Sequence, residues 1–177
     1  MINICKFSDD NYQKMFFEIR RKYIIFFNGC FDLLHRGHFE LFNEIKYYSK
    51  AYYGDKSVII CGLNSDESYK LQNKSHPLVN DEKTRAENLI SLGIDKVIIY
   101  DENNAEKVIK SLMPNCYYTT EDYYYKNTDE VLLCKKYSIQ IKAFNKIEGI
   151  SSTDIYKKIA NQVKSMIGDM IDGSIEI

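Results

Sequence analysis

The sequence predicts a doubly wound α/β domain, with a mainly parallel sheet of five strands and helices on both faces. Short runs of apolar, β-branched and aromatic residues recur along the chain, each bounded by polar segments. Segments with apolar residues at helical spacing separate these runs. A strand, a crossover helix and a second strand form a right-handed parallel unit, whose ligands bind outside the carboxyl ends of the strands.

The predicted elements alternate along the whole chain. A helix over residues 7–22 precedes the first strand, and the five strands cover residues 24–27, 57–63, 96–100, 116–119 and 140–144. Further helices are predicted from His38, from Asn80, over 105–113 and from 151–153. In the last helix the apolar spacing fades beyond Lys164, so we predict a domain over residues 1–164 and a C-terminal tail over 165–177.

The composition limits the possible functions. Lys and Arg number 24 and Asp and Glu 25, so the net charge of −1 does not favour a general binder of nucleic acid or membrane surfaces. The five cysteines are odd in number and widely spaced, which is typical of reduced thiols in the cytoplasm. No apolar run approaches the roughly 18 residues of a membrane span. We therefore expect a cytoplasmic protein with no membrane and no nucleic-acid partner.

The loop after the first predicted strand is the strongest functional signal. Two of only three histidines, His35 and His38, lie three residues apart around Gly37, directly before a helix. A helix N-terminus attracts phosphate, and imidazoles there add hydrogen-bond donors. Asp32 can tie the loop together, and Gly37 leaves room for phosphate oxygens. The alternatives are a plain turn with surface histidines, and a zinc site, for which no further Cys or His spacing completes the ligand set.

The residues that carry a family resemblance are those from Gly29 to His38. They match the signature G-x-F-D-x-x-H-x-G-H of the cytidylyltransferase-like nucleotidyltransferases. The longer string from Phe27 to His35 resembles the adenylyltransferase domain that activates heptose 1-phosphate, and glycerol-3-phosphate cytidylyltransferases are the next most similar group. The stretch from Asn64 to Lys70, with a further lysine, also resembles the heptose-phosphate enzymes, and residues 149–153 resemble a second signature, G-[IY]-S-T-T.

The resemblance implies a role for each matching residue. Catalysis is implied for His35, His38, Lys70 and Lys74, with the histidines donating to phosphate oxygens and a lysine steadying the attacking phosphate. Nucleotide binding is implied for Asn28, Gly29, Cys30, Phe31, Asp32, Gly37, Arg85, Asp122, Gly149, Ile150, Ser151, Ser152 and Thr153. Acceptor binding is implied for Asn64, Asp66, His76, Thr119 and Tyr123. No metal ligand from the protein is expected.

Simpler interpretations stand beside several of these roles. Each lysine could be solvated surface, and Arg85 could brace the loop of these lysines or pair with Asp81 one helical turn away. The hydroxyl residues 151–153 could only cap a helix. The tyrosine-rich run 117–125 could stack on bases or form ordinary strand and pocket walls.

The chain departs from its relatives at several positions. His76 precedes Pro77 where the relatives have arginine, Ser152 replaces a threonine, and Thr119 and Thr120 replace the lysine and glycine of a K-G-x-D-Y motif. The connection over residues 50–55 is also longer. We therefore expect a less cationic site and an altered acceptor.

The function implied is transfer of a nucleoside monophosphate from a nucleoside triphosphate, with ATP favoured, to a phosphorylated sugar such as heptose 1-phosphate. Pyrophosphate leaves, and Mg²⁺ accompanies the triphosphate. One alternative is a CTP-dependent enzyme of the glycerol-3-phosphate type, and an alternative of another class is a catalytically silent nucleotide-binding module. The expected partners are the triphosphate, a small phosphorylated substrate and a second copy of the chain in a homodimer.

Overall fold

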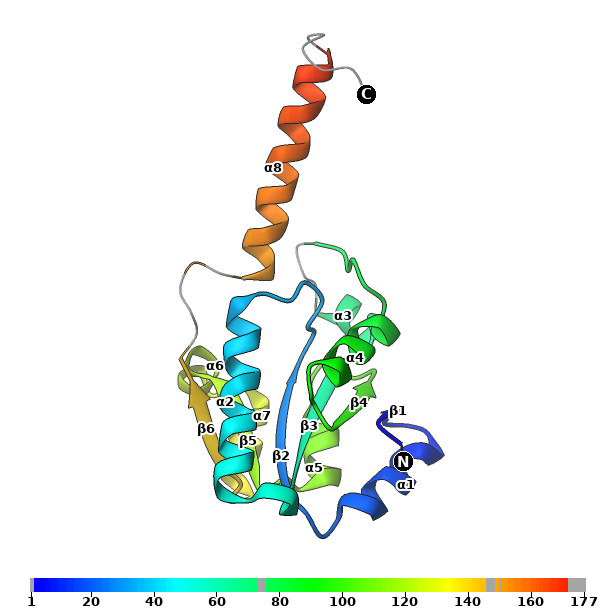
Figure 1. Ribbon diagram of the computed structural model, residues 1–177, viewed down its shortest axis with the longest axis vertical. Helices are drawn as coiled ribbons and strands as arrows, with labels where there is room; N and C mark the ends of the chain where they lie inside the picture. The colour runs from blue at the N-terminus through cyan, green and yellow to red at the C-terminus, as the bar shows by residue number, and fades with distance from the viewer. Residues whose placement is uncertain (1, 73–75, 146–148, 150, 172–177) are drawn as a thin grey trace.

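A computed structural model of the chain describes residues 2–72, 76–145, 149 and 151–171. Six strands form one sheet in the order β1-β4-β3-β2-β5-β6, and every neighbouring pair is parallel (Figure 1). The strands are β1 (Ile4–Lys6), β2 (Tyr23–Gly29), β3 (Ser57–Asn64), β4 (Lys96–Tyr100), β5 (Cys116–Thr120) and β6 (Gln140–Phe144). The doubly wound parallel fold is confirmed, with six strands rather than the five expected.

The additional strand is β1, which lies at the edge of the sheet beside β4. Only three residues pair, with Ile4 opposite Val97 and Lys6 opposite Ile99. A strand of this length has too few alternating residues for its periodicity to be detected in the sequence. The helix expected over residues 7–22 follows it as α1 (Asp10–Ile19), capped by the Asp9 carboxylate.

Helices fill the connections between the strands. Besides α1 they are α2 (Arg36–Tyr52), η1 (Gly54–Lys56), α3 (Asp66–Leu71), α4 (Glu82–Ser91), α5 (Glu106–Leu112), α6 (Glu121–Lys126), α7 (Asp129–Lys136) and α8 (Ser152–Ile171). One expectation needs correction, because helix α2 begins two residues before His38. No helix was predicted over residues 66–70, which form α3 because Ser65 caps a helix there.

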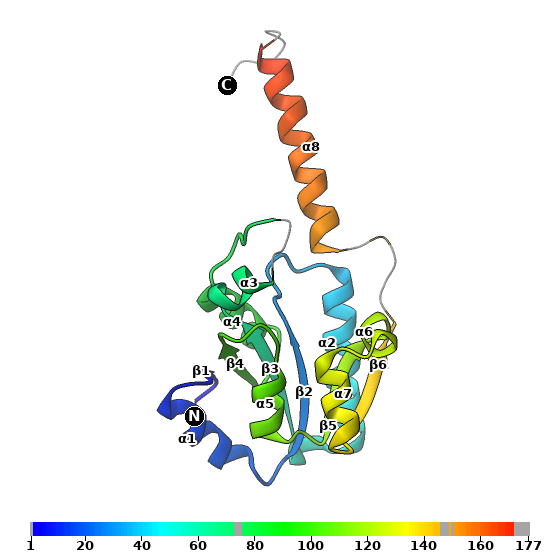
Figure 2. The ribbon, with the colours of Figure 1, turned by 180° about the vertical axis from the view of Figure 1, so that it is seen from behind.

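The two faces of the sheet are covered by different helices (Figures 1 and 2). Helices α2 and α4 pack on one face, where Phe42 and Leu89 meet side chains of β2 and β3. Helices α1, α5 and α7 pack on the other face, where Met15 and Val108 join a second buried cluster. Because the strands are covered on both faces, their apolar runs are nearly continuous.

Helix α8 differs from all of these, because it extends away from the sheet (Figure 1). It continues past Lys164 to Ile171, and none of its described side chains is buried. Ile159, Val163, Met166 and Ile167 are each about half exposed. None of the helices in the described residues is both long and apolar enough to cross a membrane.

Candidate active site

A cavity of about 740 Å³ opens at the carboxyl ends of the strands. It lies beside β2, where the strand order reverses because β3 and β5 flank β2 on opposite sides. This is the position at which parallel α/β sheets bind ligands. Of the predicted site residues, the cavity brings together Asn28, Gly29, Cys30, Phe31, Asp32, His35, Gly37, His38, Asn64, His76, Thr119, Asp122, Tyr123, Ser151, Ser152 and Thr153.

The turn after β2 is shaped by the aromatic ring of Phe31. Phe31 has a φ of 50°, which is unusual for a residue with a large side chain, and its ring packs 5.6 Å from Phe27 and 5.5 Å from Phe42. A Cβ on Gly29 would lie 3.0 Å from the same ring. Gly29 is therefore needed because the buried Phe31 ring occupies the space beside it.

The two signature histidines lie face to face at the start of α2. Their ring centroids are 3.8 Å apart with 26° between the planes, and the His38 Nδ1 accepts a hydrogen bond from the His35 backbone N–H at 3.4 Å. A Cβ on Gly37 would lie 3.2 Å from the His35 ring. Gly37 therefore makes room for an imidazole, whereas the sequence had suggested room for phosphate oxygens. Stacked rings of this kind do not converge on one metal ion.

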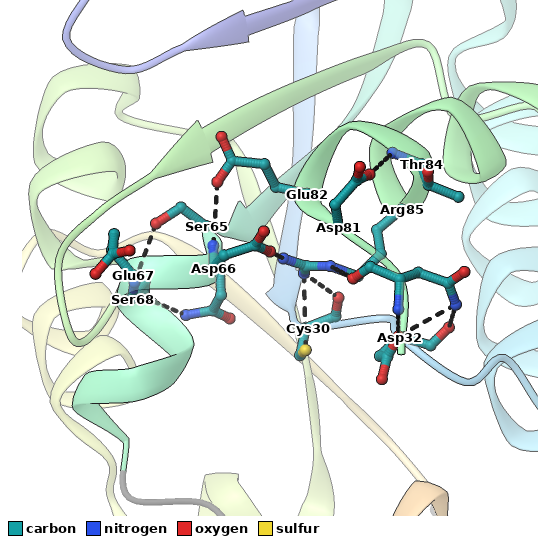
Figure 3. Close-up of polar contacts among 12 residues, drawn as sticks. Cys30, Asp32, Ser65, Asp66, Glu67, Ser68, Asp81, Glu82, Thr84 and Arg85 are labelled. Atoms are coloured by element: carbon teal, nitrogen blue, oxygen red, sulfur yellow. Dashed lines mark hydrogen bonds and ion pairs between the residues drawn. The ribbon is translucent and has the colours of Figure 1, made fainter. Parts of the chain in front are cut away.

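Arg85 lies behind the signature loop, outside the cavity lining (Figure 3). Its fully buried guanidinium donates to the Asp66 carboxylate at 2.7 Å, to the Cys30 carbonyl oxygen at 2.7 Å and to the Asn80 carbonyl oxygen at 3.2 Å. Bracing of the segment that carries Lys70, one of the expectations for Arg85, agrees with this contact, because Asp66 begins α3. Arg85 pairs with Asp66 rather than with Asp81, because its buried side chain is directed toward the Cys30 loop.

Asp66, which was expected to bind the acceptor, does not line the cavity either. Its carboxylate is occupied by Arg85, and its backbone N–H donates to the Glu82 carboxylate at 3.0 Å. The ion pair joins the start of α3 to α4 and to the signature loop. Arg85 and Asp66 thus brace the site from outside the cavity.

Lys70, one of the two lysines expected to be catalytic, does not line the cavity. Lys70 is on α3, its side chain is 68% exposed, and its ammonium group pairs with Glu67 at 2.6 Å. This hydrogen bond raises the pKa of Lys70. Lys74 and Ile150 lie outside the described residues. Gly149 is exposed, has a φ of +75° and does not line the cavity.

The floor of the cavity contains Tyr100, which sequence reasoning missed, and Tyr117, which belongs to the run 117–125 considered as strand and pocket walls. The Tyr117 hydroxyl donates to the Asn28 Oδ1 at 2.8 Å, and the Asn28 Nδ2 donates to the Tyr100 hydroxyl at 3.4 Å. Burial raises the pKa of both tyrosines, so they remain neutral hydroxyls at physiological pH. The only signal for Tyr100 in the sequence was its place in a strand whose carboxyl end lies at the same rim as the others.

A further polar wall comes from α7 and the end of β5. Thr128 and Glu130 line the cavity, and the Glu130 carboxylate accepts a hydrogen bond from the Ala105 backbone N–H at 3.2 Å. On the opposite side Thr120 donates to the Asp122 carboxylate. Among the described lining residues there is no lysine or arginine, and the acidic groups are Asp32, Asp122 and Glu130. The wall offers hydroxyls and carboxylates, which suit hydroxyl groups of a ligand.

The hydroxyl residues at the start of α8 line the opposite side of the cavity mouth. The Ser151 hydroxyl donates to the Asp154 carboxylate at 2.6 Å and accepts the Asp154 N–H at 3.1 Å. The Ser152 hydroxyl donates to the Leu33 carbonyl oxygen at 3.1 Å. Ser151 therefore caps the helix, while Ser152 contacts the signature loop. Two helix N-termini, those of α2 and α8, thus face one cavity.

No group of three or more potential His, Cys, Asp or Glu metal ligands occurs within the described part of the chain. The donor set of the cavity consists of imidazoles, hydroxyls and separate carboxylates. This set fits a Mg²⁺ ion that is bound mainly by phosphate oxygens and water, because Mg²⁺ commonly keeps several waters and uses few protein carboxylates.

Comparison with known proteins identifies the family. A family model described as cytidylyltransferase-like matches residues 26–158. The bifunctional protein HldE of Geobacter metallireducens is 38% identical over 143 residues, which is 79% of this chain and 27% of the relative. The HldE of Aliarcobacter butzleri is 36% identical over 146 residues, 81% of this chain and 28% of the relative. The chain thus spans less than a third of the length of these relatives.

Solved structures support the fold. The lipopolysaccharide core biosynthesis protein of Thermoplasma volcanium superposes with a TM-score of 0.54 at 23% identity, covering 71% of this chain and 98% of that one. A pantoate-β-alanine ligase of Francisella tularensis, complexed with an ATP compound and β-alanine, superposes with a TM-score of 0.54 at 18% identity. The superposition covers 92% of this chain and 78% of the ligase. At these identities the likeness concerns the fold alone.

Proposed function

Because the chain belongs to the cytidylyltransferase-like family and is a nucleotidyltransferase, we propose that it transfers a nucleoside monophosphate to a phosphorylated sugar, with release of pyrophosphate. ATP is the favoured donor, and heptose 1-phosphate is the favoured acceptor. The adenylyl group and the sugar follow from the resemblance of the stretch from Phe27 to His35 to the heptose-phosphate enzymes. Activities that belong to other parts of the longer relatives are outside this proposal.

One observation carries the proposal: two helix N-termini and a stacked histidine pair face a single cavity at the strand-order reversal. Each N-terminus presents backbone N–H groups and a partial positive charge to an anion. A triphosphate has several phosphate groups in a row, so two such ends suit it better than one. The histidines lie at α2, and the hydroxyls of Ser151 and Thr153 lie at α8.

The mechanism needs no covalent intermediate with the protein. The acceptor phosphate attacks the α-phosphorus of the donor in line, and pyrophosphate leaves from the opposite side. His35 and His38 donate to phosphate oxygens whose negative charge grows in the transition state. The start of α8 holds the β- and γ-phosphates, and a Mg²⁺ ion bound with the triphosphate would supply positive charge that neutralises part of the phosphate charge.

The acceptor end of the cavity supports a hydroxyl-rich substrate. The Tyr100, Tyr117 and Thr128 hydroxyls and the Glu130 carboxylate line it. These groups exchange hydrogen bonds with sugar hydroxyls. Thr119, which replaces the lysine of the relatives' K-G-x-D-Y motif, agrees with a lining made of hydroxyl groups.

The test measures pyrophosphate release with Mg·ATP or Mg·CTP and a panel of acceptors that includes heptose 1-phosphate, hexose 1-phosphates and glycerol 3-phosphate. We expect release with ATP and a sugar phosphate, and almost none from a His35→Ala/His38→Ala double variant. Release only with CTP and glycerol 3-phosphate would overturn the sugar acceptor in favour of the cytidylyl alternative. Tight nucleotide binding without release for any acceptor would favour the silent module.

A thermal-shift comparison distinguishes adenine from cytosine as the base of the preferred nucleoside triphosphate. A ligand that binds only the folded state raises the unfolding temperature according to its concentration relative to Kd. We expect Mg·ATP to give a larger shift than Mg·CTP at equal concentration. The reverse order would support the alternative prompted by the Gly149 to Ser151 stretch, which resembles the cytidylyl enzymes.

A further inference from the structure

The Asp32 carboxylate joins three separate segments of the chain. It accepts the Tyr156 hydroxyl of α8 at 2.7 Å, the Val79 N–H at 2.9 Å and the Asn80 N–H at 2.8 Å. The side-chain amide of Asn80 adds a bond at 3.2 Å. Asp32 is only 5% exposed, so these partners use most of its hydrogen-bonding capacity. This carboxylate therefore connects protein segments and is poorly placed to bind a ligand directly.

His76 holds Tyr156 through a second contact. The His76 and Tyr156 rings stack with centroids 3.8 Å apart and 23° between their planes. The Tyr69 hydroxyl of α3 lies 3.1 Å from the His76 Nδ1 and donates to the His76 carbonyl oxygen at 3.1 Å. Tyr156 is thus bonded at its hydroxyl and covered on its ring face, and His76 is itself braced from α3.

The start of α8 has few other attachments to the body of the domain. No described side chain of α8 is buried, so core packing does not hold this helix. In the described residues, its side-chain hydrogen bonds to the body are those of Ser152 to the Leu33 carbonyl oxygen and of Tyr156 to Asp32. Both reach neighbouring residues of the signature loop, next to the histidines.

We infer that Asp32, Tyr156 and His76 form a latch that positions the first turn of α8 over the cavity and thereby sets the affinity for the triphosphate. The inference rests on the proposed function, in which Ser151 to Thr153 hold the β- and γ-phosphates. Tyr156 and Asp32 are positioning residues, because they act through the placement of this turn. The bond between them joins a hydroxyl to a carboxylate, a type roughly twice as strong as a neutral hydrogen bond.

The protonation states suit this bond at neutral pH. Burial raises the pKa of Tyr156, which keeps its hydroxyl proton available for donation. Burial also tends to raise the pKa of Asp32, but the bonds from Tyr156, Val79 and Asn80 outweigh it and lower the pKa overall. Asp32 therefore stays ionised, and its contribution to stability is lost only as the pH falls below the ordinary range of an aspartate.

The test compares binding of Mg·ATP and of AMP to the full chain by calorimetry. Tyr156→Phe keeps the ring that stacks on His76 and removes only the hydroxyl. We expect it to weaken Mg·ATP binding roughly tenfold, as for loss of a hydrogen bond to a charged group, and to leave AMP binding unchanged. Tyr47→Phe is the matched control, because Tyr47 is on α2 and 75% exposed. In kinetics, the KM for the triphosphate should rise much more than kcat falls.

Two further variants separate the parts of the latch. His76→Phe retains a ring against Tyr156 and should keep more affinity for Mg·ATP than His76→Ala. Combining Tyr156→Phe with Asp32→Ala should weaken binding no more than Asp32→Ala alone, because both changes remove the same bond. Additive losses in the double variant would overturn the pairing of these two residues.

The outcomes distinguish this inference from the proposed function. If the wild-type chain binds Mg·ATP and Tyr156→Phe binds it equally well, the latch is overturned while the proposed function stands. An equal loss of ATP and AMP binding in Tyr156→Phe would likewise overturn the latch, because the effect would then be a general distortion. A wild-type chain that binds neither Mg·ATP nor Mg·CTP would overturn both.

Discussion

Helices α2 and α8 both begin at the cavity, but they are held there in different ways. Helix α2 packs along the sheet, with Phe42 and Ile45 almost fully buried. Helix α8 has no buried side chain among its described residues and is attached by polar contacts in its first turns. One end of the proposed triphosphate site is therefore part of the core, while the other can shift without disturbing the core.

The energies of the two attachments explain the difference. Burying a large apolar side chain stabilises a fold by about 1.5–3 kcal/mol, and α2 contributes several such residues. Helix α8 is held mainly by individual hydrogen bonds, of which one to a charged group is worth about 1.5–3 kcal/mol. The histidines thus belong to a rigid element, which suits the preorganisation that transition-state stabilisation requires.

The largest expected effect comes from removing the donors on the rigid helix. His35→Ala and His38→Ala should each lower turnover by roughly two to four orders of magnitude, as for loss of a preorganised donor to a developing oxyanion. Arg36→Ala is the matched control, since its side chain is 74% exposed and pairs with Glu40. The measurement is kcat for pyrophosphate release, with circular dichroism to verify folding. A folded double histidine variant with wild-type turnover would remove the catalytic role.

The next prediction compares how much the packing of α2 and the packing of α8 contribute to the free energy of unfolding. Phe42→Ala should lower the free energy of unfolding by about 3–5 kcal/mol, because it leaves a cavity between α2 and the sheet. Ile159→Ala should change it by less than about 0.5 kcal/mol, since this side chain is 47% exposed. Urea denaturation of the two variants tests the contrast. Similar losses would mean that α8 is covered in solution, for example by a second copy of the chain.

A variant of Lys70 tests whether the ammonium group of this α3 residue assists the reaction in the cavity between the starts of α2 and α8. Because its ammonium group pairs with Glu67 outside the cavity lining, we expect Lys70→Ala to lower turnover by less than about tenfold. Glu67→Ala, which frees the lysine, provides the comparison in the same kinetic assay. A loss as large as that of the histidine variants would show that Lys70 leaves its partner and reaches the attacking phosphate.

The smallest effect is expected at the far end of α8. Deleting residues 165–177 should leave turnover within about twofold of wild type. The residues that α8 contributes to the cavity lining are at its start, far from the deleted segment in sequence. Kinetics and light scattering should be measured together. The homodimer remains a prediction. Loss of the dimer without loss of turnover would agree with the small effect expected for the deletion. A folded truncation without activity would contradict it.

The fold was predictable because its signals are local. The continuous apolar runs of β2 and β3 follow from burial on both faces, and the cap and apolar spacing of α4 lie within a few neighbouring residues. The signature histidines were found in the same way, as two residues three apart at the start of a helix. The strand β1 was missed because three residues at a sheet edge have no periodicity.

The partners inside the site could not be predicted, because they are distant in sequence. Tyr156 and Asp32 are 124 residues apart, and Arg85 and the Cys30 carbonyl are 55 apart. For Arg85, the local rule of pairing one helical turn away gave the wrong partner, since a fully buried guanidinium takes the partners that the fold brings to it.

The sequence by itself determined the parallel α/β fold, the position of the signature loop and many of the residues that line the cavity. These depend on spacings of two to four residues, which hydrophobic burial and helix capping impose locally. Only the tertiary structure decided that Arg85 braces the loop from behind, that Asn28 bonds Tyr117 across neighbouring strands, and that α8 rests on Asp32. Each of these contacts depends on how strands and helices are ordered in space, because buried polar groups must find hydrogen-bond partners wherever the chain places them.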